Sequence, residues 1–262
     1  MIIIGERLNS SRKSVYDAFQ VKDKNFLIDQ TVSQEAAGAQ YIDFNAAALV
    51  DREIEILRWA IPLLEEKIHG SLSIDTPNVK ALEEAFKICR KRPMLNSITG
   101  ETKRIESLSP LVREFKPQVI CLCLDDGGFP RSVAKALAIA KKMSALLQKL
   151  GLKPEDIFID PLVRPVGVDP SAIDLCLKSL AGIKKSLPEI RTVAGISNVS
   201  FGLPLRQLMN RTLLVLALQN GLDAAICDPL DNELMAMLHA AEALLGRDPS
   251  LRNFLRFIKN QK

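Results

Sequence analysis

Short apolar segments alternate with helix-compatible segments eight times along this chain of 262 residues. The apolar segments predict strands at residues 2–4, 41–45, 72–75, 93–96, 118–124, 157–160, 192–196 and 222–227. Apolar residues between them recur at helical spacing, for example Ile54, Leu57, Ile61 and Leu64. One helix is expected to begin at Thr76-Pro77, and a basic tail to follow the last helix at residue 245. Eight strands and eight helices in about 250 residues are typical of a closed parallel barrel. The sequence therefore predicts an α/β fold, a single (β/α)8 TIM barrel.

An open, doubly wound sheet would show the same alternation, so the first turn of the chain is informative. The first apolar run is followed by Gly5-Glu6-Arg7-Leu8-Asn9 rather than by GxGxxG, and no P-loop motif occurs. No linker, low-complexity segment or shift in composition divides the sequence. We therefore expect one domain over residues 1–262.

The composition excludes several classes of partner. The net charge is only +4, and the aromatic residues, 5% of the chain, are not interleaved with basic residues, which argues against nucleic-acid binding. The start, Met-Ile-Ile-Ile-Gly-Glu, lacks the basic region of a signal peptide. No uncharged run reaches the roughly 18 residues of a membrane span. We expect a cytoplasmic protein that binds neither nucleic acid nor membranes.

The cysteines and histidines give no metal-binding or disulfide pattern. Five cysteines are present without a CxxC pair: Cys89, Cys121, Cys123, Cys176 and Cys227. Their odd number, and the apolar runs around three of them, predict free buried thiols in a reducing compartment. With two histidines and no HExxH motif, we expect no metal site.

Acidic and amide residues recur where the predicted strands stop. They are Glu6, Asn9, Asp43, Asn45, Asp75, Asn96, Asp160, Asn198 and Asp228. One such residue is explained by helix capping. A barrel, however, brings the carboxyl ends of all its strands to one mouth, where ligands bind. Because carboxylates placed together repel unless a ligand compensates them, the ring of residues predicts a functional site.

The residue types at this mouth indicate the kind of ligand. Carboxylates and amides offer planar arrays of acceptors and donors, with little positive charge beyond Arg206 and Arg211. A carboxylate can accept two parallel N–H bonds from an aminopyrimidine edge. A phosphate would call for Gly-rich backbone amides and more basic residues. The pattern favours a neutral, flat heterocycle that carries many N–H groups.

These residues also resemble a known family over essentially the whole chain. The matching motifs are Gly5-Glu6-Arg7-Leu8-Asn9, Asp43-Phe44-Asn45, Asp75, Asn96-Ser97, Ile159-Asp160-Pro161, residues 195–200 and Asn210-Arg211-Thr212. They resemble the pterin-binding barrel family, and within it the methyltetrahydrofolate:corrinoid methyltransferases. Members of that group include the methyltransferase of the corrinoid/iron–sulfur protein and the folate module of cobalamin-dependent methionine synthase.

The resemblance implies catalytic roles for three positions, Asn198, Asp75 and Asp160. Asp75, Asn96 and Asp160 would bind the hydrogen-bonding edges of the pterin, with tetrahydrofolate or 5-methyltetrahydrofolate as the substrate. Asn198 would approach N5, the nitrogen that bears the methyl group. Its amide can donate to N5 or accept from a protonated N5–H, while the carboxylates fix orientation and raise proton affinity nearby.

Other matching positions have supporting roles by the same resemblance. Phe201 and Arg206, on the loop after the seventh predicted strand, would flank the pterin. Glu6 and Asp43 are expected to support the barrel mouth. No metal ligand is implied.

The implied reaction is methyl transfer between N5 of tetrahydrofolate and the cobalt of a corrinoid. Since the sequence has no Asp-x-His-x-x-Gly cobalamin motif, we expect the corrinoid on a separate protein that docks at the mouth. The resemblance implies a homodimer and leaves the direction of transfer open. Two alternatives remain. One is a dihydropteroate synthase, although the early Asn-Val-Thr-Pro-Asp-Ser-Phe stretch of that family is absent; the other is a folate-binding subunit without catalysis.

Overall fold

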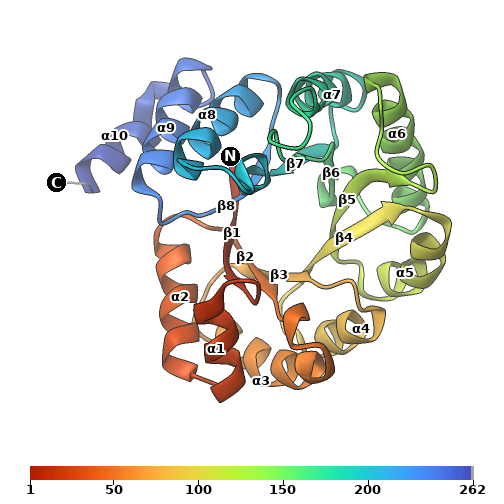
Figure 1. Cartoon of the computed structure of the whole chain (residues 1–262), viewed down its shortest axis with the longest axis vertical. Helices are drawn as coiled ribbons and strands as arrows, with labels where there is room; N and C mark the ends of the chain where they lie inside the picture. The colour runs from red at the N-terminus through yellow and green to blue at the C-terminus, as the bar shows by residue number, and fades with distance from the viewer. Residues whose placement is uncertain (261–262) are drawn as a thin grey trace.

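The computed structural model describes residues 1–260 and contains a closed barrel of eight parallel strands. Each strand pairs with the next along the chain, and β8 pairs with β1 to close the ring. The strands are β1 (Ile2–Asn9), β2 (Tyr41–Asn45), β3 (Ser71–Asp75), β4 (Met94–Gly100), β5 (Gln118–Asp125), β6 (Ile157–Asp160), β7 (Arg191–Gly195) and β8 (Ala224–Cys227). Figure 1 shows the helices arranged around the outside of this ring. The predicted (β/α)8 barrel is confirmed.

Ten α-helices occur among the described residues. Two of them, α1 (Lys13–Val21) and α2 (Lys24–Ala36), connect β1 to β2. One α-helix follows each later strand: α3 (Glu53–Glu65), α4 (Val79–Ile88), α5 (Thr102–Phe115), α6 (Val133–Lys149), α7 (Ala172–Ser186), α8 (Arg206–Gln219) and α9 (Asn232–Leu244). The last helix, α10 (Arg252–Asn260), packs against α9 near the C-terminus (Figure 1).

Two strands, β1 and β4, continue several residues past their predicted ends. β1 continues to Asn9 instead of stopping at residue 4, because a register shift between Gly5 and Leu8 lets it stay paired with β2. β4 likewise continues to Gly100 through shifts in its pairing with β5. Glu6 therefore lies within a strand, in the irregular part of β1, and not in the loop that follows it.

Helix boundaries at two places also differ from the prediction. α4 begins at Val79 rather than at Thr76, because the side chain of Asn78 caps its first turn. The segment after α9 is a helix, α10, and not merely a basic tail. The carboxylate of Asp248 accepts from the backbone N–H groups of Asn253 and Phe254 and so stabilises the start of this helix.

The interior of the barrel is filled near the starts of its strands. Six buried apolar side chains from six strands form this inner cluster: Ile4, Met94, Ile120, Phe158, Val193 and Ala224. A larger apolar core lies between the strands and the surrounding helices. Because side chains occupy the amino-terminal half of the barrel, open space inside it lies at the carboxyl ends of the strands.

Four of the five cysteines are buried free thiols, and Cys89 is half-buried. Burial raises the pKa of Cys89 to about 12 and raises those of Cys121 and Cys176 further, so these side chains stay protonated. The predicted free thiols are therefore unreactive side chains that pack in the apolar core. Within residues 1–260, no helix is long and apolar enough to cross a membrane.

Candidate active site

A cavity of about 920 Å³ opens at the carboxyl ends of the strands. Every strand, or the turn directly after it, contributes at least one lining residue. The sequence-predicted residues that line the cavity are Glu6, Asn9, Asp43, Asp75, Asn96, Asp160, Asn198, Phe201, Arg206 and Asp228. The acidic and amide residues at the strand ends thus converge on one cavity.

Two residues predicted for the mouth are not part of the cavity wall. Arg211, on α8, faces α9 instead: its Nη2 donates to Asp231 Oδ1 at 2.7 Å, and its Nη1 pairs with Glu233. Asn45 ends β2, and its Nδ2 donates to Asp75 Oδ2 at 2.8 Å. It therefore holds a lining residue without lining the cavity itself.

Asp43 lies on the part of the cavity wall that β2, β3 and β4 form. It is 4% exposed, and its Oδ1 accepts from both Ser73 Oγ (2.7 Å) and Asn96 Nδ2 (3.0 Å). Burial, and secondly the nearby charge of Asp75, raise the pKa of Asp43 to about 8. Because both hydrogen bonds go to Oδ1, the other oxygen is available for a proton. At neutral pH this carboxyl is mainly protonated.

Asp75 lies beside Asp43 on the same wall and is the C-terminal residue of β3. Burial raises its pKa, the hydrogen bond from Asn45 opposes this, and the charge of Glu53 adds to it. Asp75 pairs in register with Asn96 on the neighbouring strand. The two side chains therefore present a carboxyl and an amide next to each other.

Asp160 ends β6, on a different side of the cavity, and is 6% exposed. Its Oδ1 accepts from the backbone N–H of Leu162 at 2.7 Å, the one hydrogen bond to this carboxyl within residues 1–260. Burial raises its pKa to about 7, and the bond from Leu162 lowers it in part. Asp160 is therefore present in both protonation states near neutral pH, with an oxygen left for a ligand.

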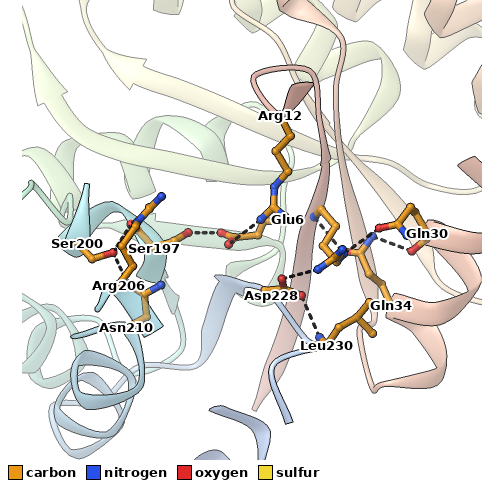
Figure 2. Close-up of polar contacts among 11 residues, drawn as sticks. Glu6, Arg12, Gln30, Gln34, Ser197, Ser200, Arg206, Asn210, Asp228 and Leu230 are labelled. Atoms are coloured by element: carbon orange, nitrogen blue, oxygen red, sulfur yellow. Dashed lines mark hydrogen bonds and ion pairs between the residues drawn. The ribbon is translucent and has the colours of Figure 1, made fainter. Parts of the chain in front are cut away.

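Glu6 connects the loops after β7 and β1 across the mouth (Figure 2). Its carboxylate accepts from the hydroxyl of Ser197 and lies 3.6 Å from Arg12 Nη2. Burial raises its pKa, while the hydroxyl of Ser197 and the charge of Arg12 oppose that shift. These interactions link the two loops through one carboxylate, and the role of Glu6 as a support of the mouth stays a prediction.

Asn198 lies in the short 3₁₀ helix Ile196–Ser200 that directly follows β7. Its side chain is exposed to the cavity and forms no hydrogen bond with any other described residue. A Cβ atom at Gly195 would lie only 2.8 Å from Asn198 Nδ2, so the glycine makes room for this amide. Asn198 is thus held at its backbone while its amide remains available to a ligand.

Arg206 binds the same 3₁₀ helix from α8 (Figure 2). Its Nη2 donates to the carbonyl oxygen of Ser197 at 2.9 Å, and its Nε donates to Ser200 Oγ at 3.1 Å. Ser200 in turn donates to Asn210 Oδ1 at 2.7 Å. These bonds fix the backbone on both sides of Asn198. Phe201, which follows the 3₁₀ helix, is 68% exposed at the cavity.

Sequence reasoning missed several lining residues, among them Arg12, Leu122 and Ile226. Arg12 lies in the β1–α1 loop, three residues beyond the predicted polar group, and only the three-dimensional fold brings it to Glu6. The two apolar residues lie in runs that predict buried strands and carry no sign of lining a cavity. Together the site offers carboxyls and amides for N–H-rich edges, and apolar surface for a flat ring.

The fold and the site together define a barrel enzyme that binds a planar, hydrogen-bonding ligand at the carboxyl ends of its strands. A family model described as "Pterin binding enzyme" matches residues 5–228. The chain belongs to this family of pterin-binding enzymes. The resemblance deduced from the strand-end motifs is thereby confirmed.

Two proteins with similar sequences indicate which members of the family this chain resembles. The chain is 34% identical to a methylcorrinoid:tetrahydrofolate methyltransferase from Eubacterium limosum, over all of this chain and 97% of that protein. It is 25% identical to the methionine synthase of Mycobacterium leprae over 86% of this chain, which corresponds to 20% of that longer protein. The first match extends over all of this chain and thus includes every strand end of the barrel.

Solved structures with the same fold include dihydropteroate synthases. The enzyme from Xanthomonas albilineans, with 4-aminobenzoic acid, aligns with a TM-score of 0.69 over 95% of this chain and 93% of its own, at 16% identity. The enzyme from Yersinia pestis aligns with a TM-score of 0.65 over 92% and 93%, at 14% identity. At this level of identity the likeness shows the barrel fold alone.

Proposed function

We propose that this protein is a methyltransferase that moves a methyl group between the cobalt of a corrinoid and N5 of tetrahydrofolate. The observation that carries the proposal is the 34% identity to the Eubacterium limosum enzyme over the whole chain. The name of that relative gives the direction from methylcorrinoid to tetrahydrofolate, and we propose the same direction here. The carboxyls and amides that line the cavity support the proposal independently.

Three residues are proposed to bind the pterin: Asp75, Asn96 and Asp160. Asp75 and Asn96 are neighbours on β3 and β4, so they can bind adjacent atoms of one heterocycle edge. Asp160, on β6, has an oxygen free for an N–H group of another edge. Hydrogen bonds of this kind orient the pterin, and orientation brings N5 to a fixed place in the cavity.

Asn198 is proposed as the residue that acts at N5. When N5 gains a methyl group, its lone pair forms the new N–C bond, the electron pair of the broken cobalt–carbon bond stays with the corrinoid, and the N5 proton is released to water. The amide oxygen of Asn198 can accept from N5–H before transfer, and its NH2 group can donate to the N5 lone pair in the reverse reaction. An uncharged amide serves both states, and the amide of Asn198 has no competing hydrogen bond among the described residues. The corrinoid supplies or accepts the methyl group.

Phe201 and Arg206 are proposed to flank the pterin. Phe201 lines the cavity and is exposed, so its ring is available to a flat ligand. The guanidinium of Arg206 is bound to the loop that carries Asn198, which supports a second role in holding that loop.

The corrinoid is proposed to arrive on a separate protein that docks at the mouth. Exposed apolar side chains on the loops after β6 and β7 support this position: Val168 is 83% exposed and Leu205 is 76% exposed. The two loops are joined by a hydrogen bond from Val166 N to Val199 O at 3.0 Å. Adjoining exposed apolar residues beside a functional cavity are typical of an interaction surface.

We also propose that residues 1–262 act as one domain, that the protein is a homodimer and that it functions in the cytoplasm. The closed barrel, in which β8 pairs with β1, supports the first point. Exposed apolar residues on the outer helices, including Leu216 on α8 and Leu255 on α10, support an interface with a second copy. Free buried thiols suit a reducing compartment.

The direct test is a spectrophotometric assay with purified protein, tetrahydrofolate and free methylcobalamin. We expect the spectrum of the methylated corrinoid to disappear as 5-methyltetrahydrofolate forms, more slowly than with a corrinoid protein. Tight folate binding without transfer to or from any corrinoid would favour a binding subunit without catalysis. Condensation of a pterin diphosphate with 4-aminobenzoate would favour a dihydropteroate synthase. Either of these results would contradict the proposal.

A further inference from the structure

Arg104, in the first turn of α5, binds only backbone carbonyl oxygens among the described residues. Its Nη1 donates to the carbonyl of Pro77 at 2.8 Å, and its Nη2 donates to those of Thr76 (3.3 Å) and Ser97 (3.0 Å). The side chain is half-buried, and all its hydrogen bonds with residues 1–260 go to backbone carbonyls, none to a carboxylate. Because this partly buried cation donates only to carbonyl oxygens, it holds the backbone of the segments that contain Thr76, Pro77 and Ser97.

The three carbonyls come directly after two of the residues proposed to bind the pterin. Thr76 and Pro77 follow Asp75, and Ser97 follows Asn96. The ladder between β3 and β4 ends at the pair Asp75 and Asn96. Among the described residues, the one backbone hydrogen bond that links the two segments past that pair runs from Thr76 N to Asn96 O, at 3.3 Å. Arg104 therefore connects the strands at the point where sheet hydrogen bonding stops.

The loop after β3 is also held from its other side. The carboxylate of Glu53, at the start of α3, is 3% exposed and accepts from Thr76 Oγ1 at 2.6 Å and from Asn78 Nδ2 at 3.2 Å. The loop thus lies between an anionic group on α3 and a cationic group on α5. This arrangement leaves Asp75 little freedom to move relative to Asn96.

We propose that Arg104 is a positioning residue, which sets the separation of Asp75 and Asn96 and thereby the affinity for the pterin. The inference rests on the proposed function, because it takes the pterin as the ligand of these two side chains. Arg104 itself is not part of the cavity wall, so it acts through the carbonyls that it binds. Loss of its guanidinium would let the two loops separate, and small displacements of ligand-binding groups are costly.

The test compares the dissociation constant of 5-methyltetrahydrofolate for the wild type, Arg104→Met and Arg104→Lys, measured by calorimetry. We expect the Met variant to bind roughly tenfold more weakly and the Lys variant about threefold more weakly, since an ammonium cannot reach three carbonyls at once. The KM for free cobalamin should stay unchanged. A matched control is Arg58→Met, because Arg58 pairs with Glu84 on the outer surface of the helices. We expect no change in affinity for this control.

A second measurement separates positioning from a general loss of stability. If Arg104 acts through Asp75, the effect of Arg104→Met on the dissociation constant should shrink in an Asp75→Asn background. Equal factors in both backgrounds, or wild-type affinity in both Arg104 variants, would overturn the inference. If the Met variant does not fold, the Lys variant gives the same decision. If the wild type itself binds no folate, the proposed function fails first, which is a different result.

Discussion

The two sides of the cavity differ in how their polar side chains are held. On the β2–β4 side, Asp43, Asp75 and Asn96 all take part in hydrogen bonds with neighbouring side chains. On the β6–β7 side, Asp160 accepts one backbone hydrogen bond, and the amide of Asn198 forms none with the described residues. One side is thus organised before a ligand arrives, whereas the other keeps its polar groups available.

This difference matches two different tasks. A group that only binds gains affinity if it is already held in place, since little entropy is lost on binding. A group that works at an atom whose hydrogen-bonding state changes must be able to donate and to accept in turn. We infer that the β2–β4 side holds one edge of the pterin in place. The β6–β7 side adds a pterin contact through Asp160 and provides the chemistry at N5, through Asn198, and the contact with the second substrate.

The strongest test of the comparison is Asn198→Ala. Because this amide is proposed to act at N5 and contributes little to the fold, we expect kcat to fall by roughly a hundredfold or more. The dissociation constant of 5-methyltetrahydrofolate should change less than about threefold. Single-turnover transfer and calorimetry measure the two quantities. A large loss of affinity with unchanged kcat would assign Asn198 to the binding side instead.

The second test concerns Asp160, whose pKa is raised by burial to about 7. Its ionised form is the better acceptor for a pterin N–H, so folate affinity in the wild type should weaken as the pH falls through about 7. Asp160→Asn should bind roughly tenfold more weakly at pH 8.5 and lose this pH dependence. Calorimetric titrations at pH 6, 7 and 8.5 provide the check. A pH dependence that survives in the variant would exclude Asp160 as its source.

The third test concerns Asp43, on the β2–β4 side, and measures the thermal stability of the protein. The pKa of Asp43 lies at about 8 in the folded protein, above its ordinary value of 3.8. The folded state therefore binds more protons than the unfolded state between these values, and the stability that Asp43 contributes is lost as the pH rises through about 8. In Asp43→Asn this loss cannot occur.

We therefore expect the Tm of Asp43→Asn minus the Tm of the wild type to be a few degrees higher at pH 9 than at pH 5. Asparagine can keep an oxygen toward Ser73 and Asn96 and place its NH2 group where the proton would be. Thermal unfolding at both pH values tests this. An equal Tm difference at the two values would show that Asp43 ionises normally.

The smallest expected effect lies at the rim of the β6–β7 side. Leu205→Ser removes an apolar side chain that is 76% exposed beside the mouth. We expect the KM for a corrinoid protein to rise two- to fivefold, roughly the effect of one peripheral apolar contact, with turnover of free cobalamin unchanged. Leu244→Ser, at a site 88% exposed on α9, is the matched control. Equal effects of the two substitutions would show that Leu205 does not contact the corrinoid protein.

The sequence was sufficient to predict the architecture and most of the acidic and amide residues that line the cavity. Each strand is apolar and short, and the polar residue at its end marks the side that faces the cavity, as at Asp75 and Asp160. Such residues are recognised by their position, without any knowledge of their contacts. The irregular pairing of β1 was not predictable in this way, because no residue type marks the register shift between Gly5 and Leu8.

Contacts between segments that are far apart in the chain could not be predicted from the sequence either. Arg104 looks like one of many basic residues on a helix face, and only its distance to three carbonyls distinguishes it. Asn45 lies two residues after Asp43 on β2, which predicts the same face of the strand. Its side chain nevertheless binds Asp75 and does not line the cavity. The helix α10 was missed because its alternating basic and apolar residues suggested a tail, whereas Asp248 provides the cap that starts it.

The closure of the barrel has a consequence for how the chain reaches its native state. The pairing of Ile2 with Ala224 joins strands from opposite ends of the sequence, and such long-range contacts slow folding because a long loop must be closed first. Glu6 and Asp228, which both line the cavity, meet only once that pairing has formed. A folate that binds only the completed cavity would therefore favour the closed ring by mass action. Newly made chains would mature more completely where the folate is abundant.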